Sequence, residues 1–144
     1  MLKSGVYEKD KLDLNVMMKD LIESKQPEDV GAILTFQGIT RRSGVKNKEV
    51  DLIEMESYVE PANKMIQKIC DEVEKKYSVH SVLIYHLVGQ FKVGEPLVFV
   101  IVTGKTRAKA IPALEEAIHR YKTEPALWKK EVYKDGSGKW VSHA

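Results

Sequence analysis

The run from Pro96 to Thr103 (PLVFVIVT) is apolar at almost every position. A strand without a polar face must be covered on both sides by other parts of the chain, so this run predicts a central strand of a sheet. The chain has 144 residues, which is enough to bury a core around such a strand. We therefore expect one domain, over residues 1–144.

Three stretches carry apolar residues at helical spacing. The first covers residues 14–24 and follows Asp13, which is a good N-cap residue. The second has Pro61 in its first turn, where a missing backbone amide costs little, and the third has Pro112 near its start. The residues expected to face the core are Leu14, Met17, Met18, Leu21 and Ile22 in the first helix, Ala62, Met65, Ile66, Ile69, Val73 and Tyr77 in the second, and Ile111, Leu114, Ile118 and Tyr121 in the third.

Short apolar or alternating runs between these helices predict further strands. The alternation changes phase after Leu52, which predicts a β-bulge. Residues 89–94 are expected to form a turn, and residues 135–138 (DGSG) to close a hairpin whose Trp140 packs on the body or on a second subunit. This order predicts an α+β fold, with a mostly antiparallel sheet, about three helices packed on it and a small C-terminal β-hairpin. The further strands expected are residues 31–38, largely buried, and residues 49–58, 79–88, 130–134 and 139–142.

The composition argues against several classes of protein. A net charge of +2 does not fit a protein that coats nucleic acid. The single cysteine, Cys70, excludes an intrachain disulfide framework and lies beside the apolar stripe of the second helix, which predicts a packed thiol. We expect a cytoplasmic location, because the N-terminal residues lack a signal-peptide core and no apolar run reaches membrane-spanning length. His80 and His86 have no matching ligand cluster, so no metal site is predicted.

The segment from Tyr121 to Glu131 (YKTEPALWKKE) holds two lysines around a helix breaker. Pro125 ends the preceding helix and disfavours a helical conformation at Glu124, so Lys122 is expected in the last helical turn and Lys129 after a short break. Two lysines close together can lower each other's pKa and serve as nucleophile or proton acceptor. The alternative is that a lysine near a helix C-terminus only complements the macrodipole.

Two further segments supply cations at the ends of regular elements. Residues 39–48 contain four cations and no acid, among them Arg41 and Arg42, and follow a predicted strand. Lys105 and Arg107 lie between a strand and the third helix, where a helix N-terminus attracts anions. Either segment alone is usually a solvated surface. Together with the two lysines they predict a pocket for an anionic small molecule, without identifying a reaction.

The order of these signatures resembles the large, catalytic subunit of molybdopterin synthase. The similarity runs from about Gly31 to Val141, and its most specific part is the Lys-x-x-Pro-x-x-Trp-Lys-Lys-Glu run that begins at Lys122. The other matching residues are Gly31-Ala32, Phe36-Gln37-Gly38 with Arg41, Glu56, Tyr58, Gly89, Val93-Gly94-Glu95, Arg107, Ala110, Gly138 and Trp140-Val141.

The resemblance implies a hammerhead-like α/β fold and a sulfurtransferase made of two proteins. A small ubiquitin-like subunit carries a thiocarboxylate after a C-terminal Gly-Gly tail, which enters a pocket of the large subunit. Two sulfurs, delivered by successive thiocarboxylates, convert cyclic pyranopterin monophosphate into the dithiolene of molybdopterin, in molybdenum cofactor biosynthesis. The family assembly is a homodimer of large subunits with a small subunit at each end, and the resemblance implies neither a cofactor nor a metal for this subunit.

The resemblance also assigns roles to residues. Lys122 corresponds to the lysine beside the incoming thiocarboxylate, a general acid or base or a transient acyl acceptor, and Lys129 to the second catalytic lysine. Arg41 and Arg107 correspond to the anion-binding arginines. The remaining residues expected at the substrate are Ile39, Thr40, Thr106, Lys130 and Glu131.

The chain departs from the family in three places. Thr106 stands where the family often has histidine and cannot titrate near neutral pH, and Leu87 stands where it often has arginine. The sequence also ends soon after Trp140, so we expect a basic contact of the C-terminal tail to be missing, with Arg42 or Lys105 as candidate substitutes. Two alternatives stay open: a scaffold without turnover, and a non-catalytic anion- or RNA-binding module. Against RNA, the basic loops lack interleaved aromatic residues for base stacking.

Overall fold

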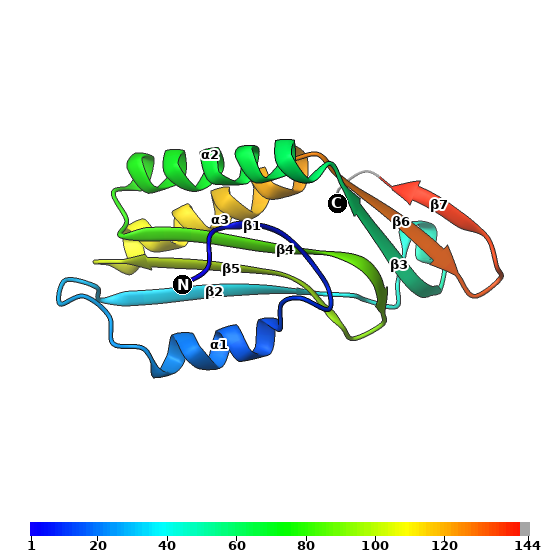
Figure 1. The fold of residues 1–144 in the computed structure, drawn as a ribbon, viewed down its shortest axis with the longest axis horizontal. Coiled ribbons are helices and arrows are strands. Elements are labelled where there is room, and N and C mark those ends of the chain that lie inside the picture. Colours follow the sequence, from blue (N-terminus) through cyan, green and yellow to red (C-terminus); the bar gives the residue numbers. More distant parts are fainter. Residues whose placement is uncertain (142–144) are drawn as a thin grey trace.

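The structure is a computed structural model and describes residues 1–141 (Figure 1). Ser142, the last residue of the predicted hairpin, lies outside the described residues. The helices are α1 (Leu14–Glu23), α2 (Val59–Tyr77) and α3 (Arg107–Thr123), with a short 3-10 turn η1 (Val45–Asn47). The strands are β1 (Gly5–Glu8), β2 (Ala32–Ile39), β3 (Val50–Ser57), β4 (Ser81–Lys92), β5 (Pro96–Gly104), β6 (Leu127–Tyr133) and β7 (Gly138–Val141).

The seven strands form one sheet in the order β2-β5-β4-β3-β6-β7, with β1 paired in parallel beside β4. The other ladders between the described strands are antiparallel, so the predicted α+β architecture is confirmed. The apolar strand β5 lies between β2 and β4, as its sequence predicted. The prediction for β2 was wrong in one respect: β2 is an edge strand, and because it has a neighbour on one side only, Ile33 is 42% exposed.

Strand β4 continues through the residues that were predicted to form a turn. Its first part pairs with β5, whereas Gly89 to Lys92 pair with β3. Gly89 has φ of 128°, a conformation that favours glycine, and the strand bends there from the long sheet toward β3 (Figure 1). Gly89 and Gly94, at the ends of the segment 89–94, indicated a turn. Of the two, Gly94 lies where the chain reverses into β5, whereas Gly89 lies inside β4. One strand thus belongs to both halves of the sheet.

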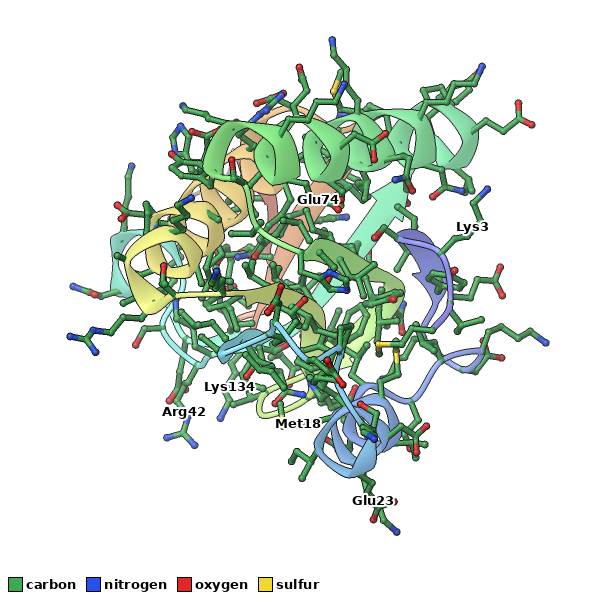
Figure 2. All side chains as sticks on the ribbon, turned by 90° about the vertical axis from the view of Figure 1, so that its left-hand side faces the viewer. Lys3, Met18, Glu23, Arg42, Glu74 and Lys134 are labelled. Atoms are coloured by element: carbon green, nitrogen blue, oxygen red, sulfur yellow. The ribbon has the colours of Figure 1, made fainter. Side chains whose placement is uncertain are left out.

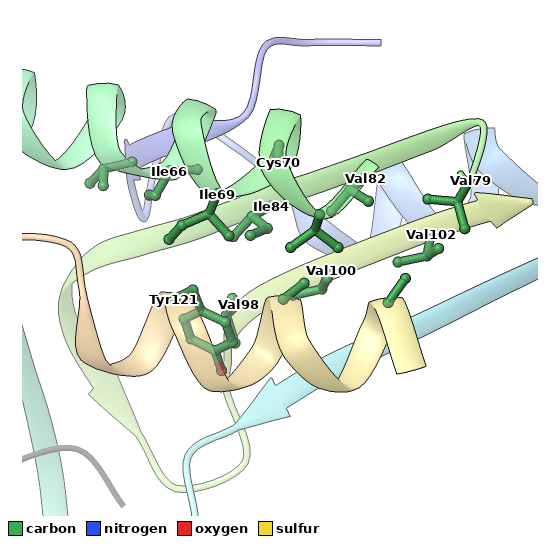
Figure 3. Packing of buried hydrophobic residues seen from close by; sticks show 14 of the residues in the cluster. Ile66, Ile69, Cys70, Val79, Val82, Ile84, Val98, Val100, Val102 and Tyr121 are labelled. Carbon is green, nitrogen blue, oxygen red and sulfur yellow. The ribbon is translucent and has the colours of Figure 1, made fainter. Parts of the chain in front are cut away.

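Helices cover both faces of the long strands. The helices α2 and α3 pack on one face, and α1 packs on the other (Figure 1). Figure 3 shows Ile66, Ile69 and Cys70 of α2 above alternate residues of β4 and β5, with Tyr121 of α3 beside them. Cys70 is buried, so the predicted packed thiol is confirmed.

The core face of α3 lies next to the predicted one. The buried residues are Ala110, Ala113 and Ala117, together with Tyr121, whereas Ile111 is 51% exposed. Small side chains allow the helix to approach the sheet closely, so residue size was a misleading guide. In α1, the Asp13 cap is confirmed, because its carboxylate accepts from the backbone of Asn15 and Val16. The predicted burial of Ile22 is wrong, since it is 76% exposed.

The direction of α3 decides where its ends lie. It starts after β5 and returns along the sheet, so Arg107 lies at one end of the long strands and Lys122 at the other (Figure 1). Among the described residues, no helix combines the length and apolar character that crossing a membrane requires.

Candidate active site

A cavity of about 580 Å³ lies where the two halves of the sheet meet the end of α3. Its walls come from β2, β3, β4, β5, β6 and α3, and from Arg41, the second residue after β2. The charged residues at its surface are Arg41, Lys122, Lys129 and Glu131. The structure therefore brings both predicted catalytic lysines and one of the predicted arginines to the same cavity.

Lys122 reaches this cavity from the last turn of α3. The helix ends at Thr123, two residues before Pro125, as the sequence predicted. The predicted displacement of Glu124 out of the helical region is wrong, since Glu124 keeps φ −100° and ψ −43° and its amide still donates to Arg120. A single bend at residues 124–126 then leads directly into β6.

Lys129 lies in a strand, earlier than the predicted start of that strand at residue 130. It pairs with Met55 of β3, and Glu131 pairs with Ile53, so these four side chains share a face of the sheet and line the cavity. Lys130 points to the other face, where its Nζ lies 5.8 Å from the ring centroid of Trp140. The structure thus does not place Lys130 at the cavity. Trp140 is 50% exposed and pairs with Lys130, so it does not pack on the body, and packing on a second subunit stays a prediction.

The surroundings of Lys129 disfavour its charged form. Burial lowers the pKa of the Lys129 amine below its ordinary value, and the positive charges of Arg41 and Lys122 act in the same direction. The carboxylate of Glu131 opposes them. A lysine with a lowered pKa in a cavity beside other cations is a good candidate for proton transfer or nucleophilic chemistry.

Arg41 is held in place by its neighbours in the chain. The backbone of Thr40 makes two hydrogen bonds to the β4–β5 turn: its amide donates to the carbonyl of Glu95, and its carbonyl accepts from the amide of Gly94. The carbonyl of Arg42 accepts from Val50 at 2.8 Å. The side chain of Thr40 is buried and lies outside the cavity lining, which departs from the expected substrate contact. Ile39, in contrast, lines the cavity as expected.

Arg42 belongs to a different surface. It lines a second, smaller cavity of about 300 Å³ with Lys92 and Lys134, and Figure 2 shows Arg42 and Lys134 on the same side of the molecule. Within one chain, Arg42 therefore does not substitute for a missing contact at the main cavity.

Glu131 is 4% exposed, and its Oε1 accepts two hydrogen bonds. The backbone amide of Val45 donates to it at 2.9 Å, and the hydroxyl of Tyr133 donates at 2.8 Å. Glu131 therefore ties the basic loop, which begins at Arg41, to the strand that carries Lys129.

Thr106 and Arg107 lie far from the cavity in the same chain. They precede and start α3 at the end of β5 that is remote from Val98, a residue of the cavity wall. Phe36, which lines the cavity, pairs with Val100 of β5, and the four residue steps from Val100 to Gly104 correspond to about 13 Å. Within one chain the structure therefore does not bring Thr106 and Arg107 to the cavity, and their expected contact with the substrate stays a prediction. Physically, α3 carries its two ends to opposite ends of the sheet.

Comparison with known proteins identifies the family. A family model described as MoaE protein matches residues 7–124 of this chain. The chain belongs to the MoaE family. The match includes Arg41 and Lys122, whereas Lys129 and Glu131 lie beyond its last residue.

Named relatives of this MoaE chain share about a third of its residues. A protein of Bacillus subtilis named molybdopterin synthase catalytic subunit is 34% identical over 123 residues, which cover 85% of this chain and 77% of that protein. The bovine protein of the same name is 34% identical over 110 residues, covering 76% of this chain and 58% of that protein. The chain spans little more than half the length of the mammalian relatives.

A solved structure shares the MoaE fold along the whole chain. The crystal structure of molybdopterin synthase from Staphylococcus aureus superimposes with a TM-score of 0.84 and 26% identity, over 99% of each chain. The predicted fold of the family is thus confirmed by both the sheet topology and this likeness.

Sequence reasoning missed most of the cavity wall of this MoaE chain. His86 was interpreted as structural, and it is buried with its Nδ1 2.9 Å from the carbonyl of Leu87, yet it also lines the cavity. Its ring lies 5.7 Å from that of Tyr121, which also lines the cavity. Met55 was missed because its contact with Lys129 depends on strand register, which no local pattern gives. Phe36 was detectable, because it lies five residues before Arg41 on a predicted strand.

Acidic and sulfur ligands do not gather in this MoaE chain. Within residues 1–141, no group of three or more histidine, cysteine, aspartate or glutamate residues is arranged to hold a metal ion. The chemistry available at the cavity is that of two amines, one guanidinium and one carboxylate, with the imidazole of His86 and the phenol of Tyr121.

Proposed function

We propose that this chain is the catalytic subunit of a molybdopterin synthase. It would transfer sulfur from the C-terminal thiocarboxylate of a small ubiquitin-like subunit to cyclic pyranopterin monophosphate, and so form the dithiolene of molybdopterin. The observation that carries this proposal is the convergence of Lys122, Lys129 and Arg41 on one cavity in a chain of the MoaE family. The relatives named catalytic subunit support it.

The charges of the cavity suit this reaction. The phosphate of the substrate and the thiocarboxylate are both anionic and repel each other when they are desolvated together. Arg41 would hold the phosphate, because a guanidinium presents several donors in a fixed plane. Fixed cations that face developing negative charge stabilise a transition state more than water does.

The two lysines would divide the remaining work. Lys122 would act beside the thiocarboxylate as general acid or base, or as a transient acyl acceptor. Lys129, whose pKa is lowered by burial and by its cationic neighbours, would contact the substrate or the intermediate. The apolar residues of the wall, including Phe36, Ile53 and Met55, would exclude water and receive the flat pterin.

The proposal includes an assembly in the cytoplasm. We propose a homodimer of this chain as the core of a heterotetramer, with a small subunit at each end. A role of Thr106 or Arg107 at the substrate would need such a second copy, because both follow Gly104, which lies about 13 Å along β5 from the cavity wall at Phe36 and Val100. A non-catalytic RNA-binding module is less well supported, because Lys105 and Arg107 lie at the opposite end of the sheet from the other two basic segments.

A single-turnover assay tests this function. The chain is mixed with thiocarboxylated small subunit and the pyranopterin precursor, and dithiolene product is followed for the native chain and for Lys122→Ala. We expect product from the native chain and a loss of at least about a hundredfold in the variant, the scale of a general acid or base. Lys75→Ala is the matched control, because Lys75 lies exposed in the last turn of α2 and shares only the favourable position at a helix C-terminus.

Three results would contradict the proposal in different ways. Binding of the small subunit without product supports the scaffold alternative. If the chain neither binds the small subunit nor makes product, the proposed activity is ruled out. Equal losses in Lys122→Ala and Lys75→Ala would mean that Lys122 only stabilises the end of its helix.

A further inference from the structure

Lys129 and Glu131 lie two residues apart on the same face of β6 and line the same cavity. Side chains at this spacing start about 7 Å apart, which a lysine side chain can span. Among the ion pairs of residues 1–141, however, none joins Lys129 to Glu131 within 4.0 Å. The carboxylate is instead held by donors other than the amine that shares its face of the strand.

Two donors hold the carboxylate of Glu131. The amide of Val45 comes from the loop after β2, and the hydroxyl of Tyr133 comes from the same strand, and both donate to Oε1. Glu131 and Tyr133 are both about 4% exposed, so water competes little for these bonds.

Both donors are themselves fixed. The backbone amide of Tyr133 donates to Ser137 across the hairpin at 2.8 Å. Burial, and then the bond to Glu131, raise the pKa of Tyr133 to about 12, so its hydroxyl stays a donor over the range in which an enzyme works. The loop around Val45 closes on itself, with the amide of Gly44 donating to Lys48 and that of Lys48 donating to Val45.

We propose that Tyr133 is a positioning residue: with the amide of Val45, its hydroxyl turns the carboxylate of Glu131 toward the loop and away from the amine of Lys129. The amine then remains available to an anionic substrate instead of being neutralised by its own strand. The role of the Lys129 amine toward a substrate rests on the proposed function. The positioning of the Glu131 carboxylate by Tyr133 and Val45 does not.

The charge around Lys129 depends on where this one carboxylate points. Arg41 faces Lys129 from the loop after β2, Lys122 from α3 and Glu131 from β6. His86 of β4 and Tyr121 of α3 line the same cavity, and β3 contributes only the uncharged side chains of Ile53 and Met55. Among residues 1–141, Glu131 is therefore the negative charge at the wall, and its distance from the amine contributes, together with burial, to the pH at which Lys129 loses its proton.

Tyr133→Phe removes one of the two donors and leaves the ring in place. The carboxylate can then turn toward Lys129, and we expect the titration midpoint of that lysine to rise by about one unit, the lower end of the effect of a close opposite charge. Glu131→Gln removes the negative charge and should lower the midpoint. Val45→Pro removes the other donor at the first position of η1, where proline is tolerated, and should raise the midpoint as Tyr133→Phe does.

The measurement is competitive acylation of the free chain with acetic anhydride across a pH series, with modification of Lys129 read by mass spectrometry. It needs no substrate and no partner. Tyr77→Phe is the matched control, because the hydroxyl of Tyr77 donates to Glu116 at 2.9 Å in another part of the molecule. We expect the Lys129 midpoint of this control to equal that of the native chain.

The double variant Tyr133→Phe with Glu131→Gln decides whether Tyr133 acts through the carboxylate. We expect its midpoint to equal that of Glu131→Gln alone. The inference is overturned if Tyr133→Phe and Val45→Pro both fold with native melting curves and leave the midpoint unchanged. It is also overturned if the upward shift survives in the double variant.

The same variants separate this inference from the proposed function. If the native chain makes dithiolene product, the pH–rate profile of Tyr133→Phe should move upward by the same amount as the labelling midpoint, with a higher KM for the anionic substrate. If the midpoint moves but the native chain makes no product, the positioning role stands and the proposed reaction fails.

Discussion

Lys129 and Lys130 are consecutive residues of β6, and they lie on opposite faces of the sheet. Lys129 lines the cavity, whereas Lys130 lies against the ring of Trp140. Strand alternation therefore provides a pair of variants that differ in face and in little else.

Lys129→Ala should lower single-turnover sulfur transfer by at least about a hundredfold, because a positioned amine is removed from the reacting groups. Lys130→Ala should keep the rate within about threefold of the native chain, the range expected for a surface contact that leaves the site unchanged. Product formation under saturating small subunit measures both. Similar losses in the two variants would show that the face of the strand does not matter, and would restore Lys130 to the site.

Lys129→Met should stabilise the fold while it removes activity. Below the folded-state pKa of Lys129, the native chain carries a charged amine that burial, Arg41 and Lys122 disfavour, so methionine should raise the free energy of unfolding on the order of 1 kcal/mol at neutral pH. Because the folded-state pKa lies below the unfolded one, this penalty is relieved as pH rises from the first value to the second.

The gain from methionine should therefore shrink as pH increases toward the ordinary pKa of lysine. Denaturant unfolding of the native chain and the variant at neutral and alkaline pH measures the difference, and Lys130→Met serves as the control without a gain. A variant that is less stable than the native chain at neutral pH would contradict this account of Lys129.

Gly44→Ala should displace the loop that follows Arg41. A Cβ at this position would lie 2.6 Å from Oε1 of Glu131 and 2.8 Å from a methyl group of Val50, and both neighbours are buried. The loop must shift, at a cost of about 1–3 kcal/mol in the free energy of unfolding. Equilibrium unfolding measures the cost, with Ser43→Ala as an exposed control next to it in sequence. Unchanged stability would mean that the loop is not pressed against Glu131.

Cys70 should be inert in the folded chain. It is 1% exposed, and burial raises the pKa of its thiol to about 11. At pH 8 its reactive thiolate is then scarcer than that of an ordinary cysteine by about a hundredfold, before steric protection is counted. The rate of labelling with a disulfide reagent, with and without denaturant, tests this. Labelling of the native chain at the rate of an exposed thiol would contradict it.

Local patterns predicted the elements well wherever a single segment decided them. The Asp13 cap, the apolar stripe of α2 and a bulge in β3 depend on neighbouring residues, and all three are present, although the bulge lies between Val50 and Leu52 and not after Leu52 as predicted. β1 was not predicted, because four residues beside β4 show no pattern of their own. The core face of α3 was misjudged in part, since three alanines and the predicted Tyr121 are its buried residues, the predicted Leu114 and Ile118 are only partly buried against the core, and Ile111 is exposed.

The candidate site could be predicted only in part, for a related reason. Lys122, Lys129 and Arg41 stand out by residue type and by their place at the ends of elements, and all three line the cavity. Arg107 has the same local signature, but the length and direction of α3 carry it to the far end of the sheet. The hydrogen bond from Tyr133 to Glu131 could not be predicted from the sequence. The two residues are two positions apart on one strand, and whether their side chains meet depends on which face of that strand is buried.

The bend of β4 at Gly89 affects the distance between Arg41 and Lys129, although Gly89 does not line the cavity. Arg41 follows the long half of the sheet, Lys129 belongs to the other half, and β4 runs continuously between the halves. The backbone conformation of this glycine, which has φ of 128°, determines how the two halves of the sheet are oriented, and with them the guanidinium of Arg41 and the amine of Lys129. A change of backbone conformation at Gly89 changes the distance between these two groups, and therefore the size of the anion that both can contact.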